Sequence, residues 1–135
     1  MILLDTNVIA ETMRPAPDRR VVSWISAAAD LYTSAVVIAE LTYGIARIAP
    51  QQRSARLRAN LDLWIGRLRG RIITFDEETS FICGEVRGLA SRSGRAMEMP
   101  DAMIAATALR HGAALATRNV RDFAVDGLIV IDPWS

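Results

Sequence analysis

The sequence predicts an α/β fold in which a parallel β-sheet lies between helices. Short apolar segments alternate with segments of helical periodicity, and residues typical of caps or turns separate them. Strands that alternate with helices in this way pair in parallel through right-handed crossovers. The chain has 135 residues, of which 51% are hydrophobic and 23% charged, so one domain spanning residues 1–135 is expected.

The N-terminal segment predicts a strand, two helices and a second strand. Residues 2–4 form an apolar run that stops at Asp5, and a helical pattern begins at Val8. Asp18 is a plausible cap for the second helix. The residues expected on the buried side of that helix are Val21, Val22, Trp24 and Ile25. Residues 31–33 form the second strand.

The middle of the chain predicts two helices and the third strand. Ser34 can cap a helix from Ala35 to about Ile48, which Pro50 separates from a longer, arginine-rich helix. The apolar residues that recur at helical spacing in this second helix are Leu57, Leu61, Trp64, Ile65 and Leu68. Residues 71–75 form the third strand.

The last part of the chain contains the most apolar helix. Asp76 opens a helix that runs to about Ala90, and residues 91–99 resemble a loop. Residues 101–110 are almost wholly apolar and rich in alanine, which predicts a helix buried on most of its circumference and ended by Gly112. The remaining expected elements are two strands and a short helical turn, at residues 113–116, 128–131 and 119–123.

Composition excludes several classes of protein. Cys83 is the single cysteine, so no intramolecular disulfide or thiol-rich zinc site is expected, and a reducing cytoplasm fits best. Neither a secretion signal nor an apolar stretch of the ~20 residues that span a membrane is expected. The net charge of +1 neither favours nor excludes nucleic acid.

The basic residues are all arginine and are unevenly distributed. Seven of the sixteen lie between Arg47 and Arg71, where Asp62 is the only acid. This arginine run is interpreted either as a solvated helix face or as a surface for RNA phosphates or an acidic partner. The spacing does not decide between these interpretations.

Four acidic residues stand near predicted strand ends or helix starts, where active sites form in open α/β sheets. Asp5 ends the first strand and Glu40 lies early in the helix after the second strand. Asp101 starts the buried helix, and Asp122 follows the fourth strand. We predict that these residues hold Mg²⁺ or Mn²⁺ at one edge of the sheet.

The surroundings of two of these acids strengthen the prediction. The neighbours of Glu40 at helical spacing are Val36, Val37, Tyr43 and Gly44. Asp101 is followed by small and apolar residues, and neither acid has an arginine within one helical turn. Carboxylates about 5 Å apart repel by roughly 3 kcal/mol per pair at an effective dielectric constant near 20. A divalent cation relieves this repulsion, and oxygen ligands without histidine or thiolate select magnesium or manganese over zinc.

Structural roles are the alternative for several polar residues. Asp5 could cap the first helix, and Asn119 followed by Asp122 matches a capping box. Four residues are interpreted first as caps and turn formers that could also position water or phosphate: Thr6, Asn7, Thr117 and Asn119. His111 is explained by its place at a helix end rather than by catalysis. The tryptophans expected in the core or an interface are Trp24, Trp64 and Trp134.

Four segments that contain these acids resemble, in order, the motifs of PIN-domain ribonucleases of the VapC toxin family, close to its FitB-like branch. They are residues 3–9, 33–41, 100–108 and 117–123, and residues 132–134 resemble the usual ending of the family. The resemblance spans nearly the whole chain, and no acidic position is replaced. It implies that Asp5 and Asp101 are the main magnesium ligands, with Glu40 and Asp122 completing an acidic pocket.

The resemblance also implies a single PIN domain with the sheet order 3-2-1-4-5, homodimers, and endonucleolytic cleavage of structured RNA such as tRNA through metal-activated water. It implies a VapB-like antitoxin that forms a hetero-oligomer with the toxin and reaches the acidic pocket with an arginine. The other end of the antitoxin would bind operator DNA, so direct DNA binding and membrane association are not expected of this chain. A bacterial cytoplasmic toxin is therefore expected.

Two other classes of function compete with the ribonuclease hypothesis. A receiver-like phospho-acceptor domain also gathers acids around magnesium at strand ends, but it needs a phosphate-binding lysine, and the chain contains no lysine. A catalytically silent module that only binds a partner or RNA is the other alternative. Metal titration separates it from a metal-dependent enzyme.

Overall fold

The structure, a computed structural model that describes residues 1–48 and 52–135, is built on a five-stranded parallel sheet. The strands are β1 (Ile2–Leu4), β2 (Leu31–Ser34), β3 (Ile72–Ile73), β4 (Ala114–Ala116) and β5 (Val130–Ile131). Their order across the sheet is β3-β2-β1-β4-β5, and Ile2 of the central strand pairs with Leu31 on one side and Ala114 on the other. The predicted fold class and strand order are confirmed.

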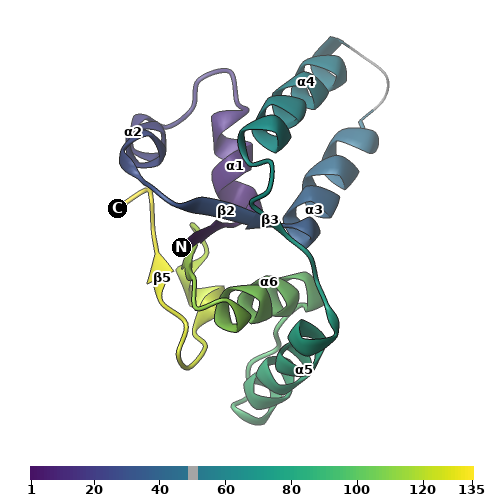
Figure 1. The fold of residues 1–135 in the computed structure, drawn as a ribbon, viewed down its shortest axis with the longest axis vertical. Coiled ribbons are helices and arrows are strands. Elements are labelled where there is room, and N and C mark those ends of the chain that lie inside the picture. The colour runs from purple at the N-terminus through teal and green to yellow at the C-terminus, as the bar shows by residue number, and fades with distance from the viewer. Residues whose placement is uncertain (49–51) are drawn as a thin grey trace.

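Helices cover both faces of the sheet. They are α1 (Thr6–Thr12), α2 (Arg19–Ala27), α3 (Ala35–Ala46), α4 (Gln52–Arg67), α5 (Glu77–Arg92), α6 (Met99–Arg110) and the 3-10 turn η1 (Val120–Phe123). Figure 1 shows α1, α3 and α4 above the strands and α5 and α6 below them. None of the helices within the described residues combines the length and apolar character that a membrane span requires.

Three helices begin at the caps that the sequence predicts. The side chains of Asp18, Ser34 and Asp76 each accept a hydrogen bond from a backbone N–H two or three residues later, at 2.9, 3.2 and 2.9 Å. Each bond satisfies one of the N–H groups that have no partner in the first turn of a helix. Local sequence therefore fixes where α2, α3 and α5 start.

The core includes the central strand and α6, which packs beside β4. Leu3 and Leu4 are fully buried, and burial of each leucine side chain contributes about 1.5–3 kcal/mol. The buried residues of α6 are Ala102, Ile104, Ala105, Ala106, Thr107 and Ala108, as the composition of this segment predicts. Trp64 and Trp134 are also buried, and Trp24 is partly buried. β1 and α6 therefore belong to the same packed core, which fixes the positions of their ends.

The structure corrects some of the predicted boundaries and contacts. The third strand is Ile72–Ile73 rather than residues 71–75, and the fifth is Val130–Ile131 rather than residues 128–131. Both are edge strands, which pair with only one neighbour. Val22 is 40% exposed because Val21 and Ile25, four residues apart, occupy the buried face of α2. Pro50 lies outside the described residues.

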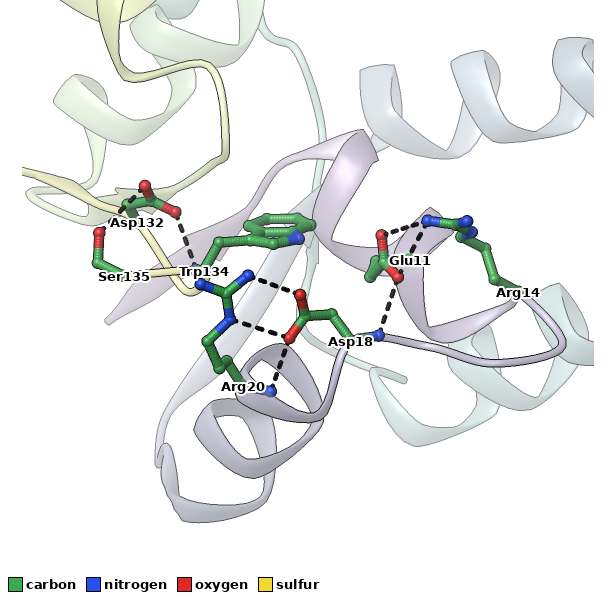
Figure 2. A network of polar contacts seen from close by, with 7 residues as sticks. All are labelled: Glu11, Arg14, Asp18, Arg20, Asp132, Trp134 and Ser135. Carbon is green, nitrogen blue, oxygen red and sulfur yellow. Dashed lines mark hydrogen bonds and ion pairs between the residues drawn. The ribbon is translucent and has the colours of Figure 1, made fainter.

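A polar network joins the α1–α2 connection to the C-terminal segment (Figure 2). The buried carboxylate of Glu11 accepts the N–H of Asp18 at 3.0 Å and pairs with Arg14 at 3.3 Å. Asp18 in turn pairs with Arg20 at 2.8 Å and raises the pKa of Arg20, and the Asp132 carboxylate is near enough to add to this shift. Figure 1 shows the C-terminus near α2. The last residues of the chain therefore lie against the start of α2.

Candidate functional site

The four acids selected from the sequence lie on four different parts of the fold. Asp5 directly follows β1, Glu40 lies on α3, Asp101 is in the first turn of α6, and Asp122 is in η1 after β4. The backbone N–H of Asp5 donates to the carbonyl oxygen of Ala116 at 2.9 Å. This bond holds the end of β1 beside the end of β4, so residues far apart in the chain become neighbours.

Asp5 is buried and firmly held, with 4% of its surface exposed. Its Oδ1 atom accepts the backbone N–H of Thr6 at 2.7 Å, which caps α1 as the structural alternative predicts. Its Oδ2 atom accepts hydrogen bonds from Thr117 Oγ1 at 2.7 Å and Asn7 Nδ2 at 3.2 Å. Burial raises the pKa of the Asp5 carboxyl, the bonds from Thr117 and Thr6 oppose this shift, and nearby Glu40 adds to it.

Glu40 is half-buried and is linked to the same cluster through Thr6. The Thr6 hydroxyl donates to Glu40 Oε1 at 2.6 Å, while the backbone N–H of Thr6 donates to Asp5. One residue therefore positions two carboxylates. Glu40 also lines a cavity of about 610 Å³ together with Pro100 and Met103, so the start of α6 lies close to α3.

The electrostatics of Asp101 show that the predicted acids converge. The pKa of its carboxyl is raised to about 6, first because of burial and then because of four other carboxylates. In order of decreasing effect, these are Asp5, Asp122, Glu40 and Glu98. The contacts agree with this: Thr6 links Asp5 to Glu40, Glu40 lines a cavity with Pro100 at the start of α6, and Asp101 and Asp122 line a second cavity.

Glu98 is an acidic residue of this cluster that the sequence analysis missed. It is the N-cap of α6, but its side chain forms no capping hydrogen bond, and it lines a cavity with Asp101 and Asp122. Its place directly before Met99 and Pro100, at a predicted helix start, was the signal that could have identified it. The cluster therefore contains five carboxylates.

Asp122 is exposed, and the capping-box interpretation of this residue is wrong. Asn119 is the N-cap of η1 but forms no side-chain capping bond, and Asp122 contacts it only through a backbone bond of 3.0 Å. Thr117 Oγ1 accepts the N–H of Asn119 at 3.1 Å, so the N–H that Asp122 would accept in a capping box already has a partner. The carboxylate of Asp122 is thereby left available to the cluster.

The two remaining polar residues, Asn7 and Thr117, join the N-terminal and C-terminal parts of the site. Asn7 Nδ2 donates to Thr117 Oγ1 at 3.2 Å, and Asn7 Oδ1 accepts the N–H of Arg118 at 3.1 Å. Thr117 acts as a turn former, because its hydroxyl accepts the N–H two residues later, whereas Asn7 lies within α1 and is neither a cap nor a turn former. They also fix the position of the Asp5 carboxylate.

The cluster contains no internal counter-ion. Among the ion pairs formed within residues 1–48 and 52–135, none includes any of the five carboxylates. His111 is the C-cap of α6, at the opposite end of this helix from Asp101. In the same described ranges, no group of three or more histidine, cysteine, aspartate or glutamate side chains is arranged so that it could hold a metal ion. No ion pair within the described residues therefore compensates the charge of the cluster.

This donor set fits a hard divalent cation. Mg²⁺ keeps several of its waters and is held in proteins through one or two carboxylates, so a complete set of protein ligands is not required. Asp5 offers a fixed carboxylate, and Asp101 offers one whose ionisation is opposed by its neighbours. A cation would remove that opposition, which makes Asp5 and Asp101 the best candidate ligands.

Part of the arginine run has a structural role. The guanidinium of Arg67 lies over the ring of Trp64 at 4.9 Å, and that of Arg71 lies over Tyr32 at 5.0 Å. Arg71 also pairs with Asp30 at 3.1 Å. These two arginines therefore stabilise packing.

The comparison with known families gives a match over most of the chain. A family model described as the PIN domain matches residues 2–127. The chain belongs to the PIN-domain family. Toxin FitB of Neisseria gonorrhoeae is 39% identical over 137 residues, which cover 99% of each protein. The VapC ribonuclease Y4jK of Sinorhizobium fredii is also 39% identical, covering 99% of this chain and 98% of the relative. The resemblance to the VapC and FitB branch of the PIN domains is confirmed.

Solved structures agree with this placement. A crystal structure of FitAcB from Neisseria gonorrhoeae superposes with a TM-score of 0.92 at 38% identity and covers 99% of both chains. VapBC2 from Rickettsia felis, bound to a DNA fragment from its promoter, superposes with a TM-score of 0.81 at 27% identity. That match covers 97% of this chain and 98% of the other. The PIN-domain fold thus extends over nearly the whole chain.

Proposed function

We propose that this PIN domain, one domain over residues 1–135, is the toxin of a bacterial toxin–antitoxin pair. In this proposal it is a cytoplasmic endoribonuclease that hydrolyses phosphodiester bonds of structured RNA such as tRNA. The observation that carries the proposal is the convergence of Asp5, Glu40, Asp101 and Asp122 without a counter-ion. Relatives named as a toxin and as ribonucleases support it.

Asp5 and Asp101 would hold Mg²⁺, or Mn²⁺ in its place, and Glu40 and Asp122 would complete the acidic pocket. The bound cation would lower the pKa of a water molecule and neutralise charge that develops on the phosphodiester. Thr117 and Thr6 hold the Asp5 carboxylate in place, and Thr6 does the same for Glu40. Burial and the neighbouring carboxylates raise the pKa of Asp101 to about 6, and a bound cation would favour its ionised form.

The proposal includes the partners that the family resemblance implies. The chain would assemble with a VapB-like antitoxin, because structures of related chains are described as FitAB and VapBC complexes. The homodimer in this proposal comes from the family resemblance alone. Some of those complexes contain DNA, which we assign to the antitoxin rather than to the PIN domain. A short upstream gene for a DNA-binding protein would support this assignment.

Substitution of Asp5 tests the ribonuclease activity directly. Purified chain and Asp5→Asn should be incubated with a tRNA mixture in Mg²⁺, in Mn²⁺ and in excess EDTA. Substitution of a residue that only orients a metal ligand reduces metal affinity or activity by about 10–100-fold. Asp5→Asn removes a proposed ligand itself, so it should reduce cleavage at least about 100-fold. EDTA should abolish cleavage by the unmodified chain.

Asp62→Asn is the matched control, because Asp62 is an exposed aspartate on α4, outside the cluster. It should cleave as the unmodified chain does, and thermal unfolding should confirm that both variants fold. Equal cleavage by Asp5→Asn, or undiminished cleavage in EDTA, would reject the metal mechanism. A chain that is inert with both metals but still binds RNA would be a silent interaction module.

A further inference from the structure

Two arginines share a cavity with the acidic cluster. The cavity has a volume of about 400 Å³ and lies beside Asp101. Three carboxylates line it, from Glu98, Asp101 and Asp122, and two guanidinium groups line it, from Arg95 and Arg121. Its volume falls within the range of about 300–1,000 Å³ that is usual for ligand sites.

The arginines do not neutralise the carboxylates beside them. Neither Arg95 nor Arg121 belongs to any ion pair formed within residues 1–48 and 52–135. The five strongest influences on the pKa of Asp101 are its burial and four acids, with no arginine among them. Both arginines are exposed and therefore accessible to a ligand.

The two arginines differ in how firmly they are held. Arg95 Nη2 donates to the carbonyl oxygen of Ala124 at 2.7 Å, which ties the α5–α6 connection to the residue after η1. Arg121 lies in η1, directly before Asp122, and no hydrogen bond within the described residues involves its guanidinium. One guanidinium is thus partly oriented by the fold, and the other is free to meet a ligand.

We propose that Arg95 and Arg121 bind backbone phosphates of the RNA beside the cleaved bond, so that the cleaved phosphodiester lies over the carboxylates. This inference rests on the proposed ribonuclease function and assigns positioning residues to it. A guanidinium donates two parallel hydrogen bonds to a phosphate, which fixes the orientation of the phosphate as well as attracting it. Glu98, Asp101 and Asp122 line the same cavity, so a phosphate held by the guanidinium groups lies next to the carboxylates.

Binding of labelled RNA tests the pair separately from cleavage. The assay uses fluorescence anisotropy with a tRNA and the full chain carrying Asp5→Asn, so that the RNA is not consumed. In this background, Arg121→Gln should weaken binding about tenfold, because it removes hydrogen bonds between a charged donor and a charged acceptor. Arg19→Gln, a change at an exposed arginine of α2, is the control and should leave the Kd within about twofold.

The salt dependence of binding identifies a phosphate contact. Loss of one such contact should reduce the slope of log K against log salt by about 0.7–0.9. Arg121→Lys should keep this slope but lose part of the affinity, since lysine binds phosphate as a point charge. Arg95→Gln should act in the same direction as Arg121→Gln, and thermal unfolding will show whether loss of its bond to Ala124 affects folding.

Kinetics with Asp5 intact separate failure of this inference from failure of the proposed function. Arg121→Gln should raise KM for RNA about tenfold with kcat within about twofold, because the contact positions RNA. The unmodified chain could cleave RNA while Arg121→Gln and Arg19→Gln bind RNA with equal Kd and equal salt slope. That result would reject phosphate binding by Arg95 and Arg121 but would leave the proposed ribonuclease function supported. Unlabelled polyglutamate and unlabelled RNA of equal charge should be compared as competitors of the labelled RNA. If polyglutamate competes more effectively, Arg95 and Arg121 bind an acidic protein instead of RNA.

Discussion

The two halves of the acidic cluster are built differently. Asp5 and Glu40 are fixed by short hydrogen bonds from Thr6 and Thr117. Asp101 and Asp122 accept no side-chain hydrogen bond within the described residues, and Asp101 is held only by its place on α6. One half is therefore set before any ligand arrives, while the other carries unbalanced charge that a cation would relieve. The following predictions test this difference, from the largest expected effect to the smallest.

Loss of the Thr117 hydroxyl should affect the fixed half most. Thr117→Val removes the 2.7 Å bond to a buried carboxylate, which should lower the free energy of unfolding by about 2 kcal/mol. Cleavage of RNA should fall at least about tenfold, because the Asp5 carboxylate loses its orientation. Chemical denaturation and steady-state cleavage measure the two effects.

Thr107→Val is the control for that substitution. Thr107 is fully buried and donates to the carbonyl oxygen of Met103 at 2.8 Å, within α6. Thr107→Val should also lower the free energy of unfolding by about 1 kcal/mol. The folded fraction of this variant should cleave RNA at the rate of the unmodified chain. If both valine variants lose activity only in proportion to their stability, Thr117 has no positioning role.

The half of the cluster that contains Asp101 should make the free energy of unfolding depend on pH when no metal is present. The Asp101 pKa rises from 3.8 to about 6 on folding, so folded protein binds this proton more tightly than unfolded protein does. Stability should therefore be lost as pH rises from about 4 to about 6, and Asp101→Asn should remove this loss. After allowance for solvent screening of a half-exposed group, the difference at pH 7 should be about 1 kcal/mol.

Urea denaturation in EDTA at pH 4, 5, 6 and 7 measures this effect. Asp126→Asn, a change at an exposed aspartate, should keep the pH profile of the unmodified chain. An identical profile for Asp101→Asn would mean that Asp101 is not under strain. Magnesium should restore stability to the unmodified chain above pH 6 and should have less effect on Asp101→Asn.

Loss of the hydrogen bond from Thr6 to Glu40 should have a smaller effect, on the affinity for metal. Thr6→Val removes the 2.6 Å bond to Glu40 Oε1 but keeps the backbone N–H that binds Asp5. The Kd for Mn²⁺ should rise about tenfold, the lower limit for residues that orient metal ligands. Isothermal titration calorimetry measures it, with Thr42→Val on α3 as the control, and equal affinities would show that Thr6 does not organise the site.

Removal of Glu98 should have the smallest effect. Glu98 is exposed and is the last of the four acids that raise the Asp101 pKa. Glu98→Gln should weaken Mn²⁺ binding less than about threefold, because exposed charges interact weakly in water. Glu85→Gln, on the exposed face of α5, provides the control. A loss as large as that of Asp101→Asn would make Glu98 a ligand.

Sequence patterns predicted the parts of this molecule that local chemistry determines. The alternation of apolar runs and helices predicted the sheet, and Asp18, Ser34 and Asp76 act as the predicted caps. The four acids could be selected because strand ends and apolar helices were recognisable around them.

What the sequence could not predict depends on the assembled fold. The lengths of β3 and β5 depend on a pairing partner at only one side of each strand. Asn119 is the N-cap of η1, but the expected bond from Asp122 does not form because the Thr117 hydroxyl accepts the N–H of Asn119. Likewise, Arg95 and Arg121 share a cavity only because the α5–α6 connection and η1 both approach the start of α6.

The bonds from Asp5 to Ala116 and Thr117 have a consequence for synthesis of the protein. Asp5 emerges from the ribosome early, but its partners belong to β4 and the residue after it, more than 100 positions later. A nascent chain that ends before β4 lacks both the strand that pairs with β1 and the hydroxyl that orients the buried carboxylate. An unfinished polypeptide therefore cannot assemble the acidic site, and translation must be nearly complete before this site exists.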